Sequence, residues 1–381
     1  MKRTAVKIFI SDGEKVYIKG KGFKSGTVEV SDGKITAFHE GTDKNADMKV
    51  YYLLPGFIDI HTHGAAGGDM QHADMNELIG IRRYMVSHGV TSFVPTTVSE
   101  SREHIIAAIK NVLKTRDGSQ EGANIIGINI EGPYFTEKHR GAHELKYLRK
   151  PDTEEFDEML EASCGLLSMI CVAPEYDNTE EFIKHVVSRG VRASVAHTDA
   201  DYETVKKAFS WGATNVTHLY NAMSPLHHRM PGCVGAAFDS DVTAEIICDG
   251  LHVHPAAVMI AIREKGVDNM VLISDSLAPA GLPDGEYTLG FQKIFVKNGK
   301  ATVAAGNLAG STTNIHACFK NVISWGVRPE DAVKMASENP ARVANAEGKG
   351  KIEVGADADF TVLDKEFELC KTIVGGKTVF E

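Results

Sequence analysis

The feature that most constrains the fold is a regular alternation of strand-like and helix-like segments through the middle of the chain. Short apolar and β-branched runs recur there, separated by longer amphipathic stretches. The eight runs span residues 57–61, 91–95, 125–130, 167–173, 193–196, 214–217, 244–248 and 270–274. Eight is the number of strand–helix units that closes a (β/α)8 barrel, so we predict an α/β chain built on a TIM-like barrel.

An open, doubly wound parallel sheet is the alternative arrangement of alternating strands and helices. That fold usually carries a glycine-rich loop after its first strand, where it binds a dinucleotide or a phosphate. No such loop follows residues 57–61. The clearest helix is expected at residues 103–114, where Ile105, Ile109 and Val112 share one face. The barrel is therefore the preferred interpretation.

Both ends of the chain carry strand signals without this alternation. Short runs fill the first 54 residues, and Asp12-Gly13 and Asp32-Gly33 between them are typical of hairpin turns. Similar runs occur at residues 350–352, 359–363, 372–374 and 378–380, with Gly375-Gly376 as a turn. We expect one small β-sandwich domain formed by residues 1–54 and 350–381, beside a catalytic barrel domain formed by residues 55–349.

Composition excludes several classes of function. The formal net charge is −10, whereas proteins that bind nucleic acid usually carry a basic surplus, so no nucleic-acid partner is expected. No run approaches the roughly 18 apolar residues of a membrane span. Six cysteines are scattered without a CxxC pair, which is typical of reduced thiols in a cytoplasmic protein.

Imidazoles and carboxylates recur where the predicted strands end. The first strand ends in His61 and His63, the third in Glu131, the fifth in His197 and the sixth in His218. His61 and His63 lie two residues apart on a strand, so both side chains point to the same face. Reactive side chains of a barrel gather at the carboxyl ends of its strands. A set of histidines with one carboxylate there suits zinc, or iron in its divalent state.

Three further positions admit two interpretations each. Asp275 follows the apolar run 270–274 and is either a helix N-cap or, as we favour beside a metal, the base that handles the proton of water. His143 is either a surface residue or a functional one. The cationic loop that contains His228 and Arg229 either holds an anion, which an Arg fork suits, or is a solvated turn.

The motifs that surround these residues resemble those of a known family. PGFIDIHTHG at residues 55–64 looks like the first-strand signature of the metal-dependent amidohydrolase superfamily, and NPAR and GADAD look like its C-terminal signature. Within the superfamily, the chain resembles the N-acetylglucosamine-6-phosphate deacetylases. The motifs that carry this second resemblance are NIEGPY (129–134), GAH (141–143), AHT (196–198), THLYNAM (217–223), DGLH (249–252), SD (274–275) and LAGS (308–311).

The resemblance implies a reaction and a metal site. The protein would be a hydrolase that removes the acetyl group from N-acetyl-D-glucosamine 6-phosphate, giving acetate and D-glucosamine 6-phosphate in amino-sugar catabolism. Glu131, His197 and His218 would hold the catalytic metal, and His61 and His63 a second ion. The cofactor would therefore be a divalent metal, zinc or iron, with one or two ions per subunit.

The resemblance also implies the catalytic and substrate-binding residues. Asp275 would accept and donate the proton, and His143 would stabilise the developing oxyanion. Contacts with the sugar phosphate would come from Ala142, His143, Asn221, Ala222, Arg229, Asp249, Gly250, Leu251, His252, Leu308, Ala309 and Gly310. Members of the family are commonly homodimers, in which part of the phosphate site is lent by the neighbouring subunit.

Two other functions stay open. One is a different amidohydrolase, such as a deaminase, a cyclic amidase or a deacetylase of N-acetylgalactosamine 6-phosphate, because the phosphate contacts do not distinguish gluco from galacto sugars. The other is a sugar-phosphate sensor without activity. An intact Asp275 and a complete set of metal ligands argue against the sensor, since a binding protein needs neither.

Overall fold

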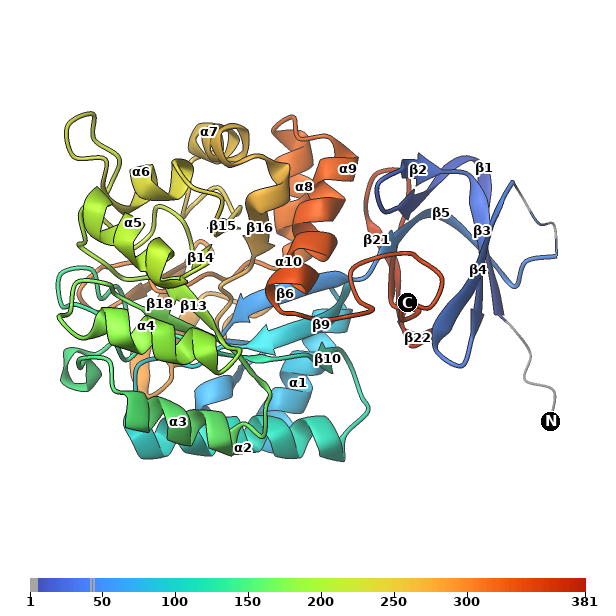
Figure 1. Ribbon diagram of the computed structural model, residues 1–381. Helices are drawn as coiled ribbons and strands as arrows, with labels where there is room; N and C mark the ends of the chain where they lie inside the picture. Colours follow the sequence, from blue (N-terminus) through green and yellow to red (C-terminus); the bar gives the residue numbers. More distant parts are fainter. Residues whose placement is uncertain (1–5, 42, 44) are drawn as a thin grey trace.

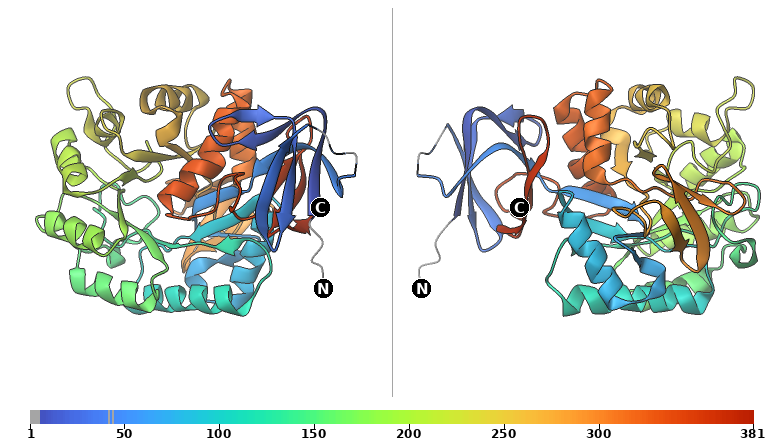
Figure 2. Two further views of the ribbon diagram at one scale, coloured as in Figure 1. Left: turned by 45° about the vertical axis from the view of Figure 1, so that its right-hand side comes forward. Right: turned by 180° about the vertical axis from the view of Figure 1, so that it is seen from behind.

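The structure is a computed structural model that describes residues 6–41, 43 and 45–381. Figure 1 shows two parts side by side: strands from both ends of the chain on one side, and a larger arrangement of parallel strands and helices on the other. The parallel strands lie inside and the helices lie outside them, as the views in Figure 2 also show.

The parallel strands form two sheets. The three-stranded sheet has the order β10 (Asn124–Ile125), β9 (Val90–Pro95), β6 (Phe57–Thr62). The six-stranded sheet runs through β11 (Ile128–Ile130), β12 (Leu167–Val172), β13 (Arg192–Val195), β14 (Asn215–Val216), β15 (Thr243–Ile247) and β16 (Met270–Ile273). These strands coincide with the eight predicted segments, of which residues 125–130 are divided between β10 and β11. The prediction of parallel strands at these positions is confirmed.

Backbone contacts join the two parallel sheets at the carboxyl ends of their strands. Isolated parallel bridges pair Thr62 with Ser276 and Thr96 with Asn129. The N–H of Asp275 also donates to the carbonyl of His61 at 2.9 Å. The first and last parallel strands, β6 and β16, are thus neighbours, as they are in a TIM-like barrel.

Helices alternate with the parallel strands along the chain. They are α1 (Met75–Val86), α2 (Arg102–Gly118), α3 (Thr153–Ala162), α4 (Thr179–Ser188), α5 (Tyr202–Trp211), α6 (Gly232–Phe238), α7 (Pro255–Lys265), α8 (Ile315–Ser324), α9 (Pro329–Val333) and α10 (Asn339–Val343). Helix α2 shows why they form: the Ser101 side chain caps the N–H of His104, and Ile105, Ile109 and Val112 are buried on one face. Within the described part of the chain, no helix combines the length and the apolar character needed to cross a bilayer.

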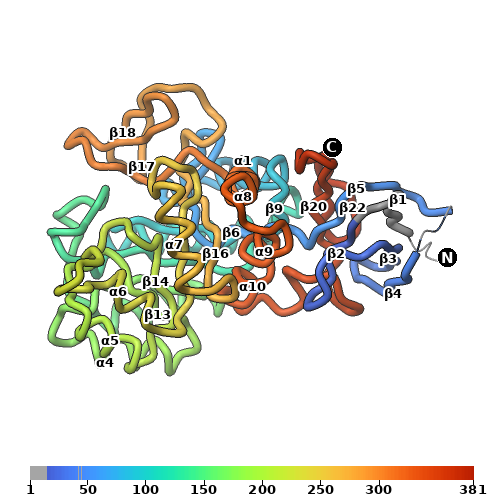
Figure 3. The backbone as a smooth tube through the Cα atoms, turned by 90° about the horizontal axis from the view of Figure 1, so that it is seen from above, coloured from blue at the N-terminus to red at the C-terminus, as the bar shows by residue number. Residues whose placement is uncertain are grey.

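A small antiparallel sheet that was not predicted follows β16. It consists of β17 (Gly285–Leu289), β18 (Gln292–Lys297) and β19 (Lys300–Val303). Its apolar face, with Ile294 and Val296 at alternate positions of β18, packs in one cluster with Val98 and Leu277 next to the ends of the parallel strands. Figure 3 shows that this sheet projects from the side of the molecule opposite α4 and α5.

Strands from both ends of the chain share one sheet. Its order is β22 (Lys377–Phe380), β21 (Leu369–Val374), β20 (Phe360–Leu363), β5 (Met48–Pro55), β1 (Val6–Ile18), β3 (Gly26–Ser31), β4 (Lys34–Glu40), with β2 (Gly22–Lys24) beside β1. Val28, Leu53 and Phe360 are fully buried in its apolar core. The two ends of the chain therefore contribute strands to one sheet and share its core.

Two details of the terminal prediction are wrong. Asp12-Gly13 is not a hairpin turn, because it lies inside β1, which pairs in parallel with β5 on both sides of a register shift between Ile10 and Lys15. Residues 350–352 form no strand. The other two turns are confirmed: Asp32-Gly33 joins β3 to β4, and Gly375-Gly376 joins β21 to β22.

Candidate metal and substrate site

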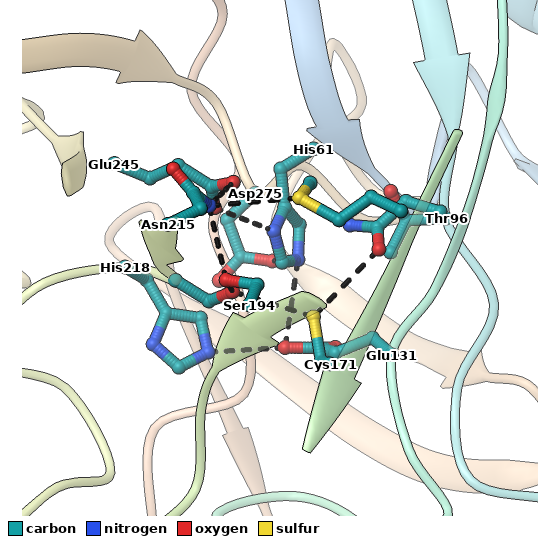
Figure 4. Close-up of polar contacts among 12 residues, drawn as sticks. His61, Thr96, Glu131, Cys171, Ser194, Asn215, His218, Glu245 and Asp275 are labelled. Atoms are coloured by element: carbon teal, nitrogen blue, oxygen red, sulfur yellow. Dashed lines mark hydrogen bonds and ion pairs between the residues drawn. The ribbon is translucent and has the colours of Figure 1, made fainter. Parts of the chain in front are cut away.

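The four histidines predicted as metal ligands point their Nε2 atoms at the carboxylate of Glu131, which follows β11. The Nε2 atom of His61 lies 3.5 Å from a Glu131 oxygen, that of His63 at 3.2 Å, that of His197 at 3.3 Å and that of His218 at 3.0 Å. All five residues are buried. Figure 4 shows His61 and His218 converging on Glu131 from different strands. The five residues predicted as metal ligands are therefore brought together.

Hydrogen bonds on the opposite side of each ring fix which nitrogen carries the proton. Three Nδ1 atoms face backbone carbonyl oxygens: His63 at 3.1 Å from Thr96, His197 at 2.8 Å from His139, and His218 at 3.2 Å from Asn221. His61 Nδ1 instead lies 3.0 Å from Glu245 Oε2. A carbonyl oxygen can only accept, so Nδ1 donates and Nε2 presents a lone pair to the centre of the site.

These lone pairs fit a cation. His197 Nε2 and His218 Nε2 are 3.1 Å apart, and both also lie against Glu131 Oε1. Electron pairs this close repel one another unless a positive charge lies between them. The Nε2 atom of His61 is buried and has no hydrogen-bond partner. Imidazole nitrogens with a carboxylate are ligands that zinc and divalent iron accept.

Asp275 closes the site on the side of the first strand. Its Oδ1 atom lies 3.2 Å from His63 Nε2 and 3.5 Å from His61 Nε2. The ligand atoms of these three residues all lie within 4.8 Å of one another, and those of Glu131, His143 and His197 form a second such group. The arrangement offers two adjacent positions for an ion.

The electrostatic environment differs between the two groups. Burial disfavours the charged form of His63, but Asp275 and Glu131 outweigh it and raise the pKa of His63 to about 9. Burial, together with the neighbouring His143, lowers the pKa of His197 to about 4. Burial also opposes the charge of Glu131, yet the surrounding histidines hold its pKa well below the ordinary value. The site therefore favours a positive charge beside Asp275 and Glu131 and a neutral ring at His197.

The backbone at these strand ends adopts a conformation that side chains other than glycine rarely take. The φ angle is +45° at His197, +31° at His218 and +50° at Asp275, with +78° at Tyr220 and +49° at Ala222. Residues held in this left-handed region cost free energy and cluster at functional sites. Here they turn the side chains that follow β13, β14 and β16 towards one another.

A cavity of about 380 Å³ opens beside the candidate ligands. This is within the roughly 300–1,000 Å³ of typical small-molecule sites. The predicted residues that line it are His63, Glu131, Ala142, His143, His197, His218, Asn221, Ala222, His252, Asp275, Leu308 and Gly310. These residues come from segments that are far apart in the chain and meet only through the fold, so the cavity gathers most of the predicted substrate contacts.

Two histidines of the cavity have defined hydrogen-bond roles. The N–H of Ser99 donates to His143 Nδ1 at 3.1 Å, so the neutral ring carries its proton on Nε2, which lies 3.5 Å from Glu131. His252 Nδ1 lies 2.7 Å from Asp249 Oδ2, and its Nε2 atom is buried without a partner. Burial opposes the charge of His252, but Asp249 outweighs it and raises the pKa.

The remaining predicted substrate contacts do not line the cavity of this chain. Arg229 lies in an exposed turn, with Nη1 2.7 Å from His228 Nε2. Asp249 supports the loop behind His252, where its Oδ1 atom accepts the N–H of Leu251 at 2.8 Å; Gly250 lies between them with a positive φ of 75°. Ala309 is fully buried in the cluster around the small antiparallel sheet.

Several residues of the site were not predicted. The cavity is also lined by Val98, Lys138, His139, Gly141, Tyr220, Leu277, Leu289 and Asn307. Glu245 was not predicted either, although it lies within an apolar strand and is fully buried. A carboxylate buried in such a run is rarely left without a partner. Its place in an apolar strand was therefore the sequence feature that could have identified Glu245 as a residue of the site.

Comparison with known proteins agrees with this architecture. Residues 52–379 match the model of the amidohydrolase family. The chain belongs to this family.

Several relatives are similar over most of their length. The chain is 40% identical to N-acetylglucosamine-6-phosphate deacetylase of Vibrio furnissii over 86% of this chain and 83% of that protein. It is 35% identical to the enzyme of that name from Bacillus subtilis (strain 168), over 94% and 93%. It is also 34% identical to N-acetylgalactosamine-6-phosphate deacetylase of Escherichia coli O157:H7, over 92% and 93%.

Solved structures extend the similarity to the fold. The N-acetyl-D-glucosamine-6-phosphate deacetylase of Mycobacterium smegmatis, a mutant in complex with N-acetyl-D-glucosamine-6-phosphate, matches with a TM-score of 0.93 at 30% identity, over 99% of this chain and 100% of that chain. The N-acetylglucosamine-6-phosphate deacetylase of Thermotoga maritima matches with a TM-score of 0.89 at 30% identity, over the same shares.

Proposed function

We propose that the protein hydrolyses the acetamide bond of N-acetyl-D-glucosamine 6-phosphate, giving acetate and D-glucosamine 6-phosphate in amino-sugar catabolism. The observation that carries the proposal is the convergence of four histidine Nε2 atoms on Glu131, with Asp275 beside them at the wall of the cavity. The names of the relatives described above, all deacetylases of N-acetylated hexosamine 6-phosphates, support it.

The proposed cofactor is zinc or divalent iron. Glu131, His197 and His218 would hold one ion, and His61 and His63 a second. The arrangement of lone pairs around Glu131 supports both assignments. A bound divalent ion supplies Lewis-acid activation, polarising the substrate carbonyl and lowering the pKa of a water molecule from about 15.7 towards about 7.

Asp275 is the proposed proton acceptor and donor. Burial opposes its charge, but His63 and His61 outweigh it and lower the pKa of Asp275, so the carboxylate is ionised near neutral pH and can act as a base. It takes a proton from the water that attacks the acetyl carbonyl carbon. It then passes that proton to the amide nitrogen as the C–N bond breaks, and the amine and acetate leave.

His143 is the proposed donor to the oxyanion. Ser99 occupies its Nδ1 atom, so the Nε2–H is directed into the site, next to Glu131. A neutral, fixed donor of this kind stabilises negative charge that develops on the carbonyl oxygen, an effect often worth about 3 kcal/mol. His143 would therefore bind the transition state more strongly than the substrate.

The phosphate would be held away from the metal ligands. His252 offers a buried Nε2 atom without a partner at the cavity wall, and Asn221, Ala222 and the segment 308–310 lie around the same cavity. Arg229 lies on an exposed turn outside this chain's own cavity, and its proposed role in phosphate binding requires a neighbouring subunit. We accordingly propose a homodimer. Six free cysteines support a cytoplasmic location.

We also propose the finer architecture and its division into domains. The bridges between β6 and β16 and between β9 and β11 support a closed (β/α)8 barrel over residues 55–349. The shared apolar core of the terminal strands supports a small β-sandwich formed by residues 1–54 and 350–381. An experimental structure with substrate would test both.

A second candidate substrate is N-acetylgalactosamine 6-phosphate. The relative from Escherichia coli O157:H7 that carries this name is 34% identical, close to the 35% of the Bacillus subtilis enzyme. The two substrates differ only in the configuration at C4, so the same metal site and phosphate contacts suit both. We place the gluco substrate first because more of the relatives carry its name.

The decisive experiment is acetate release from purified protein supplied with zinc or iron. N-acetyl-D-glucosamine 6-phosphate should be turned over faster than its galacto epimer and far faster than unphosphorylated N-acetylglucosamine. Treatment with a chelator should abolish turnover, and adding the metal back should restore it. Metal-loaded protein that releases no acetate from either phosphorylated sugar would refute the deacetylase. Release of ammonia or opening of a cyclic amide would then indicate a different amidohydrolase.

A further inference from the structure

The interior of the six-stranded sheet contains a layer of polar side chains one step below the strand ends. Barrels of this kind usually fill that space with branched apolar residues. Here the five strands from β11 to β15 contribute Asn129, Cys171, Ser194, Asn215 and Glu245, all fully buried. A buried polar layer is stable only when its groups are hydrogen-bonded, so its contacts show what it is built to hold.

Hydrogen bonds connect this layer from Ser194 to His61. Asn215 Oδ1 accepts from the hydroxyl of Thr243 at 2.6 Å, which turns the amide NH2 group of Asn215 towards Ser194 and Glu245. That NH2 group lies 3.0 Å from Ser194 Oγ and 2.8 Å from Glu245 Oε1. The other oxygen of Glu245, Oε2, lies 3.0 Å from His61 Nδ1, as Figure 4 shows. Both oxygens of the carboxylate are therefore occupied as acceptors.

Glu245 has no cation of its own. Among the described side chains, its single ion-pair partner is His61. Neither residue has any exposed side-chain surface, so water cannot replace this contact. A carboxylate buried in this way stays in place only while His61 Nδ1 donates to it.

His61 differs from the other three candidate ligands in how it is held. Backbone carbonyl oxygens fix His63, His197 and His218, and no side-chain substitution removes those acceptors. His61 alone depends on a side chain. One substitution at Glu245 can therefore change the orientation of a single ligand and leave the other three as they are.

We propose that Glu245 is a positioning residue for His61, fixing the ring so that its Nε2 atom faces the metal and raising the basicity of that ligand. The inference rests on the metal site of the proposed function. Partners of this kind, which hold the far side of a ligating histidine, typically contribute about 10–100-fold to metal affinity.

The test is a double-mutant cycle on Co²⁺ affinity in the full-length chain. Metal-depleted wild type, Glu245→Met, His61→Ala and the double variant are titrated with Co²⁺ in competition with a chromophoric chelator, and the visible absorption of bound Co²⁺ is recorded. Glu245→Met should weaken binding at the position that includes His61 by about 10–100-fold and change its spectrum. In the His61→Ala background, Glu245→Met should weaken Co²⁺ binding by less than about twofold, because Glu245 and His61 act through one contact.

Two further variants separate positioning from a general loss of stability. Glu245→Gln keeps the shape and an oxygen that accepts from His61, so its affinity should lie between those of wild type and Glu245→Met. Glu155→Gln removes another buried carboxylate, which belongs to α3 and pairs with Arg149, and this variant should bind Co²⁺ like wild type.

The outcomes distinguish this inference from the proposed function. Wild-type affinity in both Glu245 variants, or equal losses with and without His61, would overturn the positioning role and leave the metal site intact. Wild-type protein that binds no Co²⁺ would overturn the metal site and the inference together. If Glu245→Met does not fold, Glu245→Gln carries the same cycle.

Discussion

The two nitrogens of His143 perform separate tasks, so two substitutions should separate stability from catalysis. Nδ1 accepts the N–H of Ser99 at 3.1 Å, and Nε2 carries the proton that faces the site. Asparagine places its amide oxygen close to the position of Nδ1 but has no group that reaches Nε2. Glutamine places its amide nitrogen close to Nε2 but leaves the N–H of Ser99 without an acceptor.

The magnitudes follow from these contacts. His143→Asn should lower kcat by about 10²–10³-fold, the usual cost of losing one oxyanion donor, and leave the free energy of unfolding within about 0.5 kcal/mol of wild type. His143→Gln should lower kcat by about tenfold or less. Because Ser99 is buried, the orphaned N–H should lower the free energy of unfolding by about 1–3 kcal/mol.

Steady-state acetate release and urea unfolding of the metal-loaded protein provide the two measurements. His143→Leu, which lacks both groups, is the reference that should show both losses. The reasoning is refuted if His143→Asn keeps wild-type kcat, or if the two amide variants lose activity and stability in parallel.

Three further predictions concern the proton, the phosphate and a buried amine. Asp275→Asn should lower kcat by at least about 10³-fold while metal analysis finds the same ion content as in wild type; near-normal turnover would remove its role as base. Arg229→Ala should raise KM for the phosphorylated substrate by about tenfold or more and leave the slow turnover of unphosphorylated N-acetylglucosamine unchanged; equal effects on both substrates would contradict a phosphate contact. Lys265 is buried, and burial lowers its pKa from 10.5 to about 8. Between these values the unfolded chain binds more protons than the folded one, so wild-type stability should rise with pH relative to Lys265→Met. Urea unfolding from pH 7 to pH 10.5 would measure the free energy of unfolding of both proteins. If the two free energies change with pH in parallel, Lys265 has an ordinary pKa in the folded protein.

The order of strands and helices along the sequence was enough to predict where the candidate metal-binding and catalytic side chains lie. In parallel strands joined by helices, every carboxyl end meets at the same edge, so the residue after each strand has a known position. His197, His218 and Asp275 could be placed together for this reason, although they are far apart in the chain. Hydrogen bonds on the far side of each ring were not predictable, because they depend on backbone positions that only the folded chain defines.

The parts that the sequence did not predict depend on packing between distant segments. The run of Ile294, Phe295 and Val296 has the composition of a strand, but nothing local indicates that this strand packs with Val98 and Leu277 next to the site. Glu245 and His61 are 184 residues apart, and their contact follows from the strand order β15, β16, β6, in which a single strand separates the two. Asp12-Gly13 has the composition of a turn, but parallel pairing with β5 on both sides holds it within a strand.

The sheet shared by the two ends has a consequence for synthesis on the ribosome. Strand β5 pairs with β1 on one side and with β20 on the other, and the N–H of Gly56 donates to the carbonyl of Asp359 at 2.9 Å. During translation, β5 emerges about 300 residues before its second partner, so one edge remains open through synthesis of the whole middle of the chain. Nascent chains that stall before residue 360 would expose this edge to other nascent chains and to chaperones.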